Sequence, residues 1–146
     1  MSKWRARALD LFPDMRTDIQ SAESVGRLWI ELMARLARHY SAAPYAATQD
    51  PPNLFRATCL YATWCKGSDS PKTREAAAIE FYFELPRFAL QRPASVYKRF
   101  IQELIANLPL MEIEMMGGSV QPSDMKRFLA DVRQAEDERR QRSRKR

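Results

Sequence analysis

Apolar residues recur at the spacing of an α-helix through much of the chain, and the clearest example covers residues 22–41. The series follows the spacing i, i+3, i+4, i+7, i+8, i+11, i+12 and i+15, in the order Val25, Leu28, Trp29, Leu32, Met33, Leu36, Ala37 and Tyr40. These positions form one apolar stripe, with charged residues on the opposite face. Glu31 and Arg35 lie on that charged face, in the order that favours an i,i+4 ion pair. We therefore expect a long amphipathic helix here.

Two short helical segments are expected before this helix. Apolar residues from Trp4 onward predict a helix that stops near Phe12, because Pro13 disfavours helical geometry at the preceding residue. Thr17 and Gln20 have the spacing of a capping box, so a turn or a new helix is expected to start near Thr17.

A proline-rich loop and a further helix are expected after it. Residues 42–52 contain three prolines, which do not fit a helix interior. The broad apolar face of residues 53–66 predicts a helix, and Gly67 is expected to end it as the residue after the C-cap.

The next helix is expected to begin at Ser70-Pro71, since serine is a good cap and proline suits the first helical position. Its residues are apolar on nearly all sides except for Glu80 and Glu84, which are four residues apart on one face. Pro86 is expected to halt it. A helix of this kind belongs at the centre of a bundle.

The last third of the chain predicts two more helices. Residues 93–108 carry an apolar stripe between two prolines, and a final helix is expected from Ser123-Asp124 to about Val132. Residues 110–116 are ambiguous: they alternate like a short strand, but no partner strand is evident. Residues 136–146 are a polar extension that has no large apolar residue to bury.

The pattern as a whole predicts an all-α protein, a single-domain bundle of five to seven helices. The chain has 146 residues, of which 45% are hydrophobic and 29% charged, which fits one soluble globular domain with its own core. We expect the bundle to occupy residues 1–135 and a basic, flexible tail to occupy residues 136–146.

The positive charge of the chain is concentrated at its C-terminus. The sequence holds 24 Lys and Arg against 18 Asp and Glu, and residues 133–146 alone hold 7 basic and 3 acidic side chains. Candidate anion-binding residues are Arg139, Arg140, Arg142, Arg144, Lys145 and Arg146. The alternative is a solvated terminus that only keeps the protein soluble. The tail has no aromatic residue, so base stacking is not expected there.

The cysteines and the hydropathy of the chain bear on the compartment in which the protein is expected. Cys59 and Cys65 are six residues apart, about 600° around a helix, so they point to different faces and are expected to be free thiols. No paired set of four ligands indicates zinc, and no cofactor is expected. No apolar run has the length of a membrane span or signal peptide. We expect a cytoplasmic protein without a membrane partner.

The sequence contains no set of residues that is typical of a catalytic site. His39 is the single histidine, and no orienting partner is evident from its spacing. Glu80 and Glu84 lack the histidines that a di-iron bundle needs. Phosphate-binding and nucleophile motifs are missing as well. We therefore expect no enzymatic activity, although a cleft that joins His39 with Glu80 or Glu84 would revive that hypothesis.

Four segments together resemble an uncharacterised family of small bacterial helical proteins. They are Ala8–Asp14 (ALDLFPD), Leu28–Leu32 (LWIEL), Tyr61–Cys65 (YATWC) and Phe81–Pro86 (FYFELP). The resemblance covers about residues 6–90 and rests mostly on packing residues, so it bears on the fold more than on function. The chain departs from the family pattern at Phe83-Glu84, where an acidic residue and then a histidine are expected.

Two functions follow from these observations. The first is a non-enzymatic interaction protein, an immunity-type or regulatory module, that binds a protein partner through a helix face and loops such as residues 42–52. The second is binding of nucleic acid or another polyanion through the arginine-rich tail. A homo-oligomer is compatible with either function.

Overall fold

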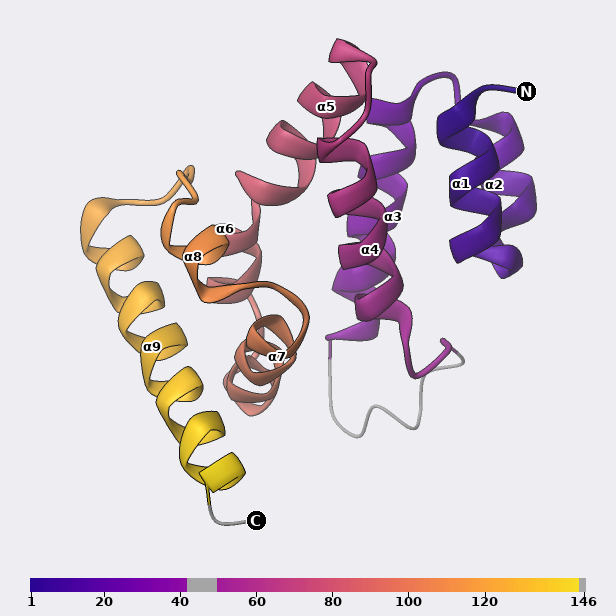
Figure 1. Cartoon of the computed structure of the whole chain (residues 1–146). Helices are drawn as coiled ribbons and strands as arrows, with labels where there is room; N and C mark the ends of the chain where they lie inside the picture. The colour runs from indigo at the N-terminus through magenta and orange to yellow at the C-terminus, as the bar shows by residue number, and fades with distance from the viewer. Residues whose placement is uncertain (42–49, 145–146) are drawn as a thin grey trace.

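The computed structural model describes residues 1–41 and 50–144, and within this part every regular element is helical (Figure 1). The all-α prediction is thereby confirmed. The described residues form more than the five to seven helices expected, so that count was wrong. The cause is proline, because helices or short turns begin at or just after Pro13, Pro71, Pro93, Pro109 and Pro122, and Pro86 lies in the first turn of another helix.

The N-terminal elements lie together on one side of the molecule (Figure 1). They are α1 (Lys3–Leu11), the 3-10 turn η1 (Pro13–Met15), α2 (Arg16–Ser21), α3 (Val25–His39) and α4 (Leu54–Lys66). The first helix ends before Phe12 as predicted, and the long amphipathic helix is present as α3. Ser24 caps α3 by accepting a hydrogen bond from the backbone N–H of Arg27 at 3.1 Å. The expected loop over residues 42–52 lies outside the described residues except for its last three positions.

The most deeply buried helix of this group is α4, not the segment after Pro71 that the sequence placed at the centre. Eight of the 13 residues of α4 are buried. Its Tyr61 ring lies 5.3 Å from Trp29 and 5.9 Å from Phe12, between centroids, so α4 joins α3 to the N-terminal turn through aromatic contacts.

The single helix expected over residues 71–85 is in fact broken into three parts. These are α5 (Pro71–Ala77), a π-helical turn η3 (Ala78–Tyr82) and α6 (Leu85–Leu90). Pro86 lies in the first turn of α6 and so opens a helix instead of halting one. Ile79 and Phe83 are 50% and 42% exposed, which places this segment at the surface. Its all-round apolar character therefore combines a buried face, with Phe81 and Leu85 fully buried, and exposed apolar side chains.

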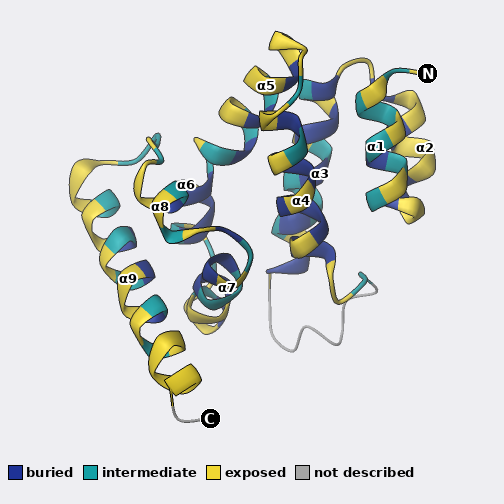
Figure 2. Ribbon diagram, in the orientation of Figure 1, coloured by how far each residue is buried: buried dark blue, intermediate teal, exposed yellow. Residues whose placement is uncertain are grey.

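The C-terminal elements are α7 (Ala94–Asn107), α8 (Leu110–Glu114) and α9 (Pro122–Arg144). The ambiguous segment after Pro109 is thus a short helix. α9 extends past residue 135, where the bundle was expected to end, and continues to Arg144. Figure 2 shows that its last turns are exposed on all sides.

One core connects the two groups of helices. Tyr40 at the end of α3 is fully buried, and its ring centroid lies 5.0 Å from that of Phe100 on α7. The Tyr40 hydroxyl donates a hydrogen bond to the Glu103 carboxylate. Arg92 adds a hydrogen bond from its guanidinium to the carbonyl of Ala37 at 3.2 Å. These contacts fix α7 against the end of α3.

Candidate functional site

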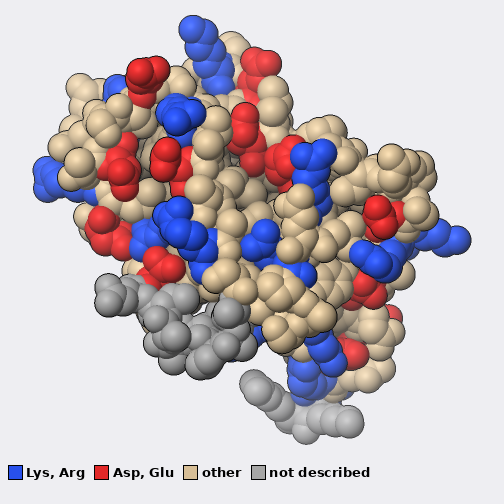
Figure 3. Space-filling model, turned by 180° about the vertical axis from the view of Figure 1, so that it is seen from behind, with Lys and Arg blue, Asp and Glu red and all other residues tan. Residues whose placement is uncertain are grey.

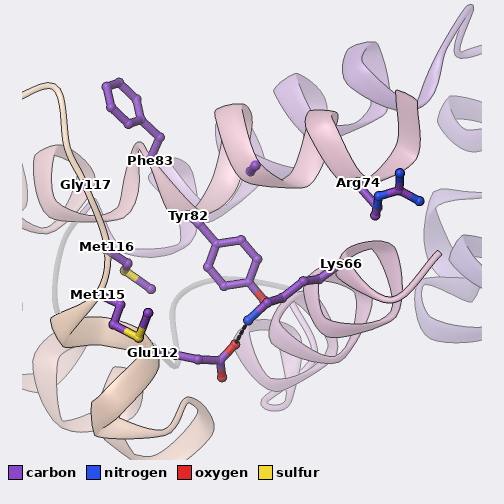
Figure 4. A pocket seen from close by; sticks show the side chains of 9 residues that line it. Lys66, Arg74, Tyr82, Phe83, Glu112, Met115, Met116 and Gly117 are labelled. Carbon is purple, nitrogen blue, oxygen red and sulfur yellow. Dashed lines mark hydrogen bonds and ion pairs between the residues drawn. The ribbon is translucent and has the colours of Figure 1, made fainter. Parts of the chain in front are cut away.

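A surface cavity of about 430 Å³ lies where the end of α4, the π-helical turn and α8 meet (Figure 4). We call it the π-turn cavity; its lining consists of Lys66, Arg74, Ala78, Tyr82, Phe83, Glu112, Met115, Met116 and Gly117. Its volume is within the range of ligand-binding pockets, about 300–1,000 Å³. Three segments that are distant in sequence thus build one concave surface.

The π-helical turn determines how two aromatic side chains meet this cavity. The backbone N–H of Phe83 donates to the carbonyl of Ala78, five residues earlier, at 2.9 Å. The turn is therefore wider than in an α-helix, a feature that is frequent at functional sites. The Tyr82 ring points into the space in front of α8, whereas the Phe83 ring points away from it (Figure 4). Phe83 remains accessible at the mouth of the cavity.

The opposite wall is the segment from α8 to Gly118, and a close backbone approach holds it in place. A Cβ atom at Gly118 would lie 2.6 Å from Cε of Met125 and 3.3 Å from Cγ of Pro86. Glycine therefore lets the chain pass close to α6 and α9.

An ion pair closes one edge of the cavity. The ammonium of Lys66 lies 2.7 Å from Oε1 of Glu112 and 5.6 Å from the ring centroid of Tyr82 (Figure 4). Arg74 also lines the cavity and donates a hydrogen bond to the carbonyl of Ser68 at 2.7 Å. Two cations against one carboxylate leave the charged edge with an excess of one positive charge.

Tyr82 presents a neutral hydroxyl at this edge. Burial, with a smaller contribution from the Glu112 carboxylate, raises the pKa of Tyr82 to about 12, and the Thr63 hydroxyl acts in the opposite direction. The hydroxyl oxygen is buried and has no hydrogen-bond partner of normal geometry among the described residues. It remains protonated at neutral pH and lies below the surface of the cavity.

Exposed apolar side chains lie in the cavity wall and beside it. Met115 is 79% exposed and Met111, one turn earlier on α8, is 72% exposed. Phe83, directly after the π-helical turn, contributes at 42%, whereas Ile79, 50% exposed, faces the separate cavity that Glu80 also lines. Sequence reasoning missed this site, although two signals pointed to it: the all-round apolar pattern after Pro71 and the methionines of residues 110–116.

The residues that the sequence nominated for anion binding lie elsewhere. Arg139, Arg140, Arg142 and Arg144 occupy the last turns of α9, while Lys145 and Arg146 fall outside the described residues. None of the four arginines lines the π-turn cavity.

His39, Glu80 and Glu84 have different partners. Nδ1 of His39 lies 3.1 Å from Oδ2 of Asp50. Glu84 lies near Arg87 and accepts a long hydrogen bond from Ser119. Glu80 lines another cavity, together with Trp4 and residues after Ser70. These contacts do not join the histidine to either glutamate.

Arg35 links the N-terminal turn to Asp50, four residues before α4 begins. Its guanidinium donates to Asp14 at 2.5 and 3.3 Å and to Asp50 at 2.9 Å. The hydrogen bonds from Arg35 lower the pKa of Asp14. The Arg35 side chain is only 11% exposed, so this cluster stabilises the fold and offers little surface to a ligand.

Both cysteines are buried free thiols. Burial raises the pKa of Cys65 to about 11 and raises that of Cys59 even further. Neither thiol is a ready nucleophile or ligand. Within residues 1–41 and 50–144, no group of three or more His, Cys, Asp or Glu could hold a metal ion. The helices described are all too short or too polar to cross a membrane.

Comparison of the chain with family models, curated protein sequences and solved structures gives no match. The resemblance to small bacterial helical proteins therefore stays a prediction.

Proposed function

We propose that this chain is a non-enzymatic helical interaction protein and that it binds a protein partner through the π-turn cavity. One observation carries the proposal: two large apolar side chains that face solvent line a preformed cavity, with Met115 79% and Phe83 42% exposed. Apolar side chains that cluster around a concave surface mark an interaction site more often than scattered ones do.

The residue types suit a partner surface. Methionine side chains are flexible and polarisable, so Met115 and Met116 can adapt to an inserted apolar group. Phe83 offers an aromatic contact at the mouth. Interface energy is usually concentrated in a few such anchors, surrounded by a polar rim.

The charged edge favours a particular partner chemistry. Lys66 and Arg74 exceed Glu112 by one positive charge. A segment that inserts an apolar side chain and places a carboxylate beside it would satisfy both ends of the cavity. We therefore propose an acidic, amphipathic segment of another protein as the occupant.

The biological role that fits this proposal is an immunity-type or regulatory module in the cytoplasm. There the buried thiols of Cys59 and Cys65 would stay reduced. A module of this kind acts by covering a partner's surface and needs no catalytic group of its own.

Matched substitutions test the proposal. Met115→Asp should weaken binding of the partner, recovered from the producing cell and then purified, by at least about tenfold, which is typical of an interface anchor. Leu60→Asp is the control, because Leu60 is also an exposed apolar residue, 45% exposed, but does not line the cavity. Equal weakening by the two substitutions, or no effect of Met115→Asp, would overturn the proposal.

A further inference from the structure

The C-terminal part of α9 projects beyond the core. The last buried residue of α9 is Ala135, and the helix continues to Arg144. These nine additional residues extend it by about 13 Å at 1.5 Å per residue. The segment from residue 136 onward contains no apolar side chain, so the core does not explain why it is there.

Charge changes sign along this projection. Glu136 lies next to the core, with its side chain 12% exposed, and pairs with Arg139 at 3.8 Å and Arg140 at 3.2 Å. Arg142 and Arg144 form no ion pair with a described residue, and both are exposed. The free positive charge is thus greatest at the tip.

The cations on the projecting turns are all arginines, although lysines occur in the body, for example at Lys66, Lys72 and Lys98. A guanidinium is a planar fork that can hold a phosphate through two parallel hydrogen bonds, whereas an ammonium is a point charge. Cations are also attracted to the C-terminal end of the helix dipole, but lysines or fewer arginines would serve that purpose equally well. In Figure 3, acidic and basic side chains alternate over much of the surface, and basic ones lie beside the end of α9.

We infer that Arg139, Arg140, Arg142 and Arg144 form a site for the phosphate backbone of double-stranded nucleic acid. This function is independent of the proposed partner-binding cavity. The contacts are to phosphates and do not read sequence. A single strand is disfavoured because the projection has no aromatic side chain for base stacking. A membrane surface is disfavoured because the projection has no apolar face to insert.

The test is fluorescence anisotropy of a labelled DNA duplex of mixed sequence, with the full chain, over a salt series. The wild type should bind, and its affinity should fall steeply with salt. A plot of the logarithm of the association constant against the logarithm of salt concentration should steepen by up to about 0.9 for each phosphate contacted. The variant R139Q/R140Q/R142Q/R144Q should bind at least about tenfold more weakly at low salt and show a smaller slope.

The control variant is R16Q/R27Q/R38Q/R56Q. It removes the same number of positive charges from exposed positions on α2, α3 and α4. It should keep most of the wild-type affinity. Helix content by circular dichroism should be the same in both variants, because all eight side chains are exposed.

Three outcomes would overturn the inference. In the first, the wild type fails to bind the duplex at low salt. In the second, the two quadruple variants lose affinity equally, which would show that binding responds to net charge alone. In the third, the α9 arginines contribute more to binding of phosphatidylserine vesicles than to binding of the duplex, which would assign the site to a membrane. Met115→Asp should leave duplex binding unchanged, which separates this inference from the proposed function.

Discussion

The ammonium of Lys66 lies 2.7 Å from Oε1 of Glu112 and so connects the end of α4 to α8 across the π-turn cavity. The two residues are separated by the whole of α5, α6 and α7 in sequence. Lys66 is 59% exposed and Glu112 is 26% exposed, so solvent screens the pair. The pair therefore serves to shape the cavity edge more than to stabilise the fold.

Lys66→Met should change the free energy of unfolding by less than about 1 kcal/mol, as is usual for exposed ion pairs. Urea unfolding of Lys66→Met, Glu112→Gln and the double variant checks this in a double-mutant cycle. A coupling energy well above that value would show that the pair is a structural element.

Gly118→Ala should destabilise the fold by about 1 kcal/mol, because the added methyl group collides with the contact between this segment and α6 and α9. The nearest atom, Cε of Met125 at 2.6 Å from the added Cβ, ends a flexible side chain and can move, whereas Cγ of Pro86 at 3.3 Å belongs to a rigid ring. Met125→Ala in the same chain should recover part of the loss, since it removes the colliding atom. If urea unfolding shows Gly118→Ala to be as stable as wild type, the close approach is wrong.

Asp14 should make the fold sensitive to acid. Its folded-state pKa is depressed by hydrogen bonds from Arg35, so its contribution to stability is present above the ordinary value of 3.8 and is lost as pH falls through the folded value. Asp14→Asn should therefore be less stable than wild type at neutral pH, and the difference should shrink below pH 3.8. Chemical unfolding at several pH values measures this. A difference that is constant with pH would contradict the assignment.

The thiols should be unreactive in the folded protein. Burial raises the pKa of Cys65 to about 11 and that of Cys59 further, so little thiolate forms at pH 8. Ellman's reagent should detect both thiols only after denaturation. Rapid reaction of either one in the native protein would show that its helix opens readily.

The sequence predicted the helices whose apolar stripes face the core, because the periodicity of α3 and α7 follows directly from burial of one face. The prediction was wrong after Pro71, where large apolar residues such as Ile79 and Phe83 are exposed. Periodicity cannot distinguish a helix that is apolar because it is central from one that is apolar because it offers a surface. The π-helical turn itself depends on packing between remote segments.

Proline was also open to two interpretations. Pro86 was expected to end a helix, but it begins α6, since the residue that cannot continue one helix suits the first turn of the next. The π-turn cavity could not be predicted for a related reason. It requires Lys66, Tyr82 and Glu112 to meet, and no local pattern specifies that meeting.

Site-specific photo-crosslinking in the producing cell tests whether a protein partner binds at the π-turn cavity. A photoreactive amino acid at position 115, beside the cavity, is compared with the same group at position 60, on the exposed face of α4. A partner bound at the π-turn cavity should give one dominant crosslinked protein from position 115, lost when Phe83→Asp is added, and no such product from position 60. Equal products from both positions, or a product that survives Phe83→Asp, would contradict this prediction.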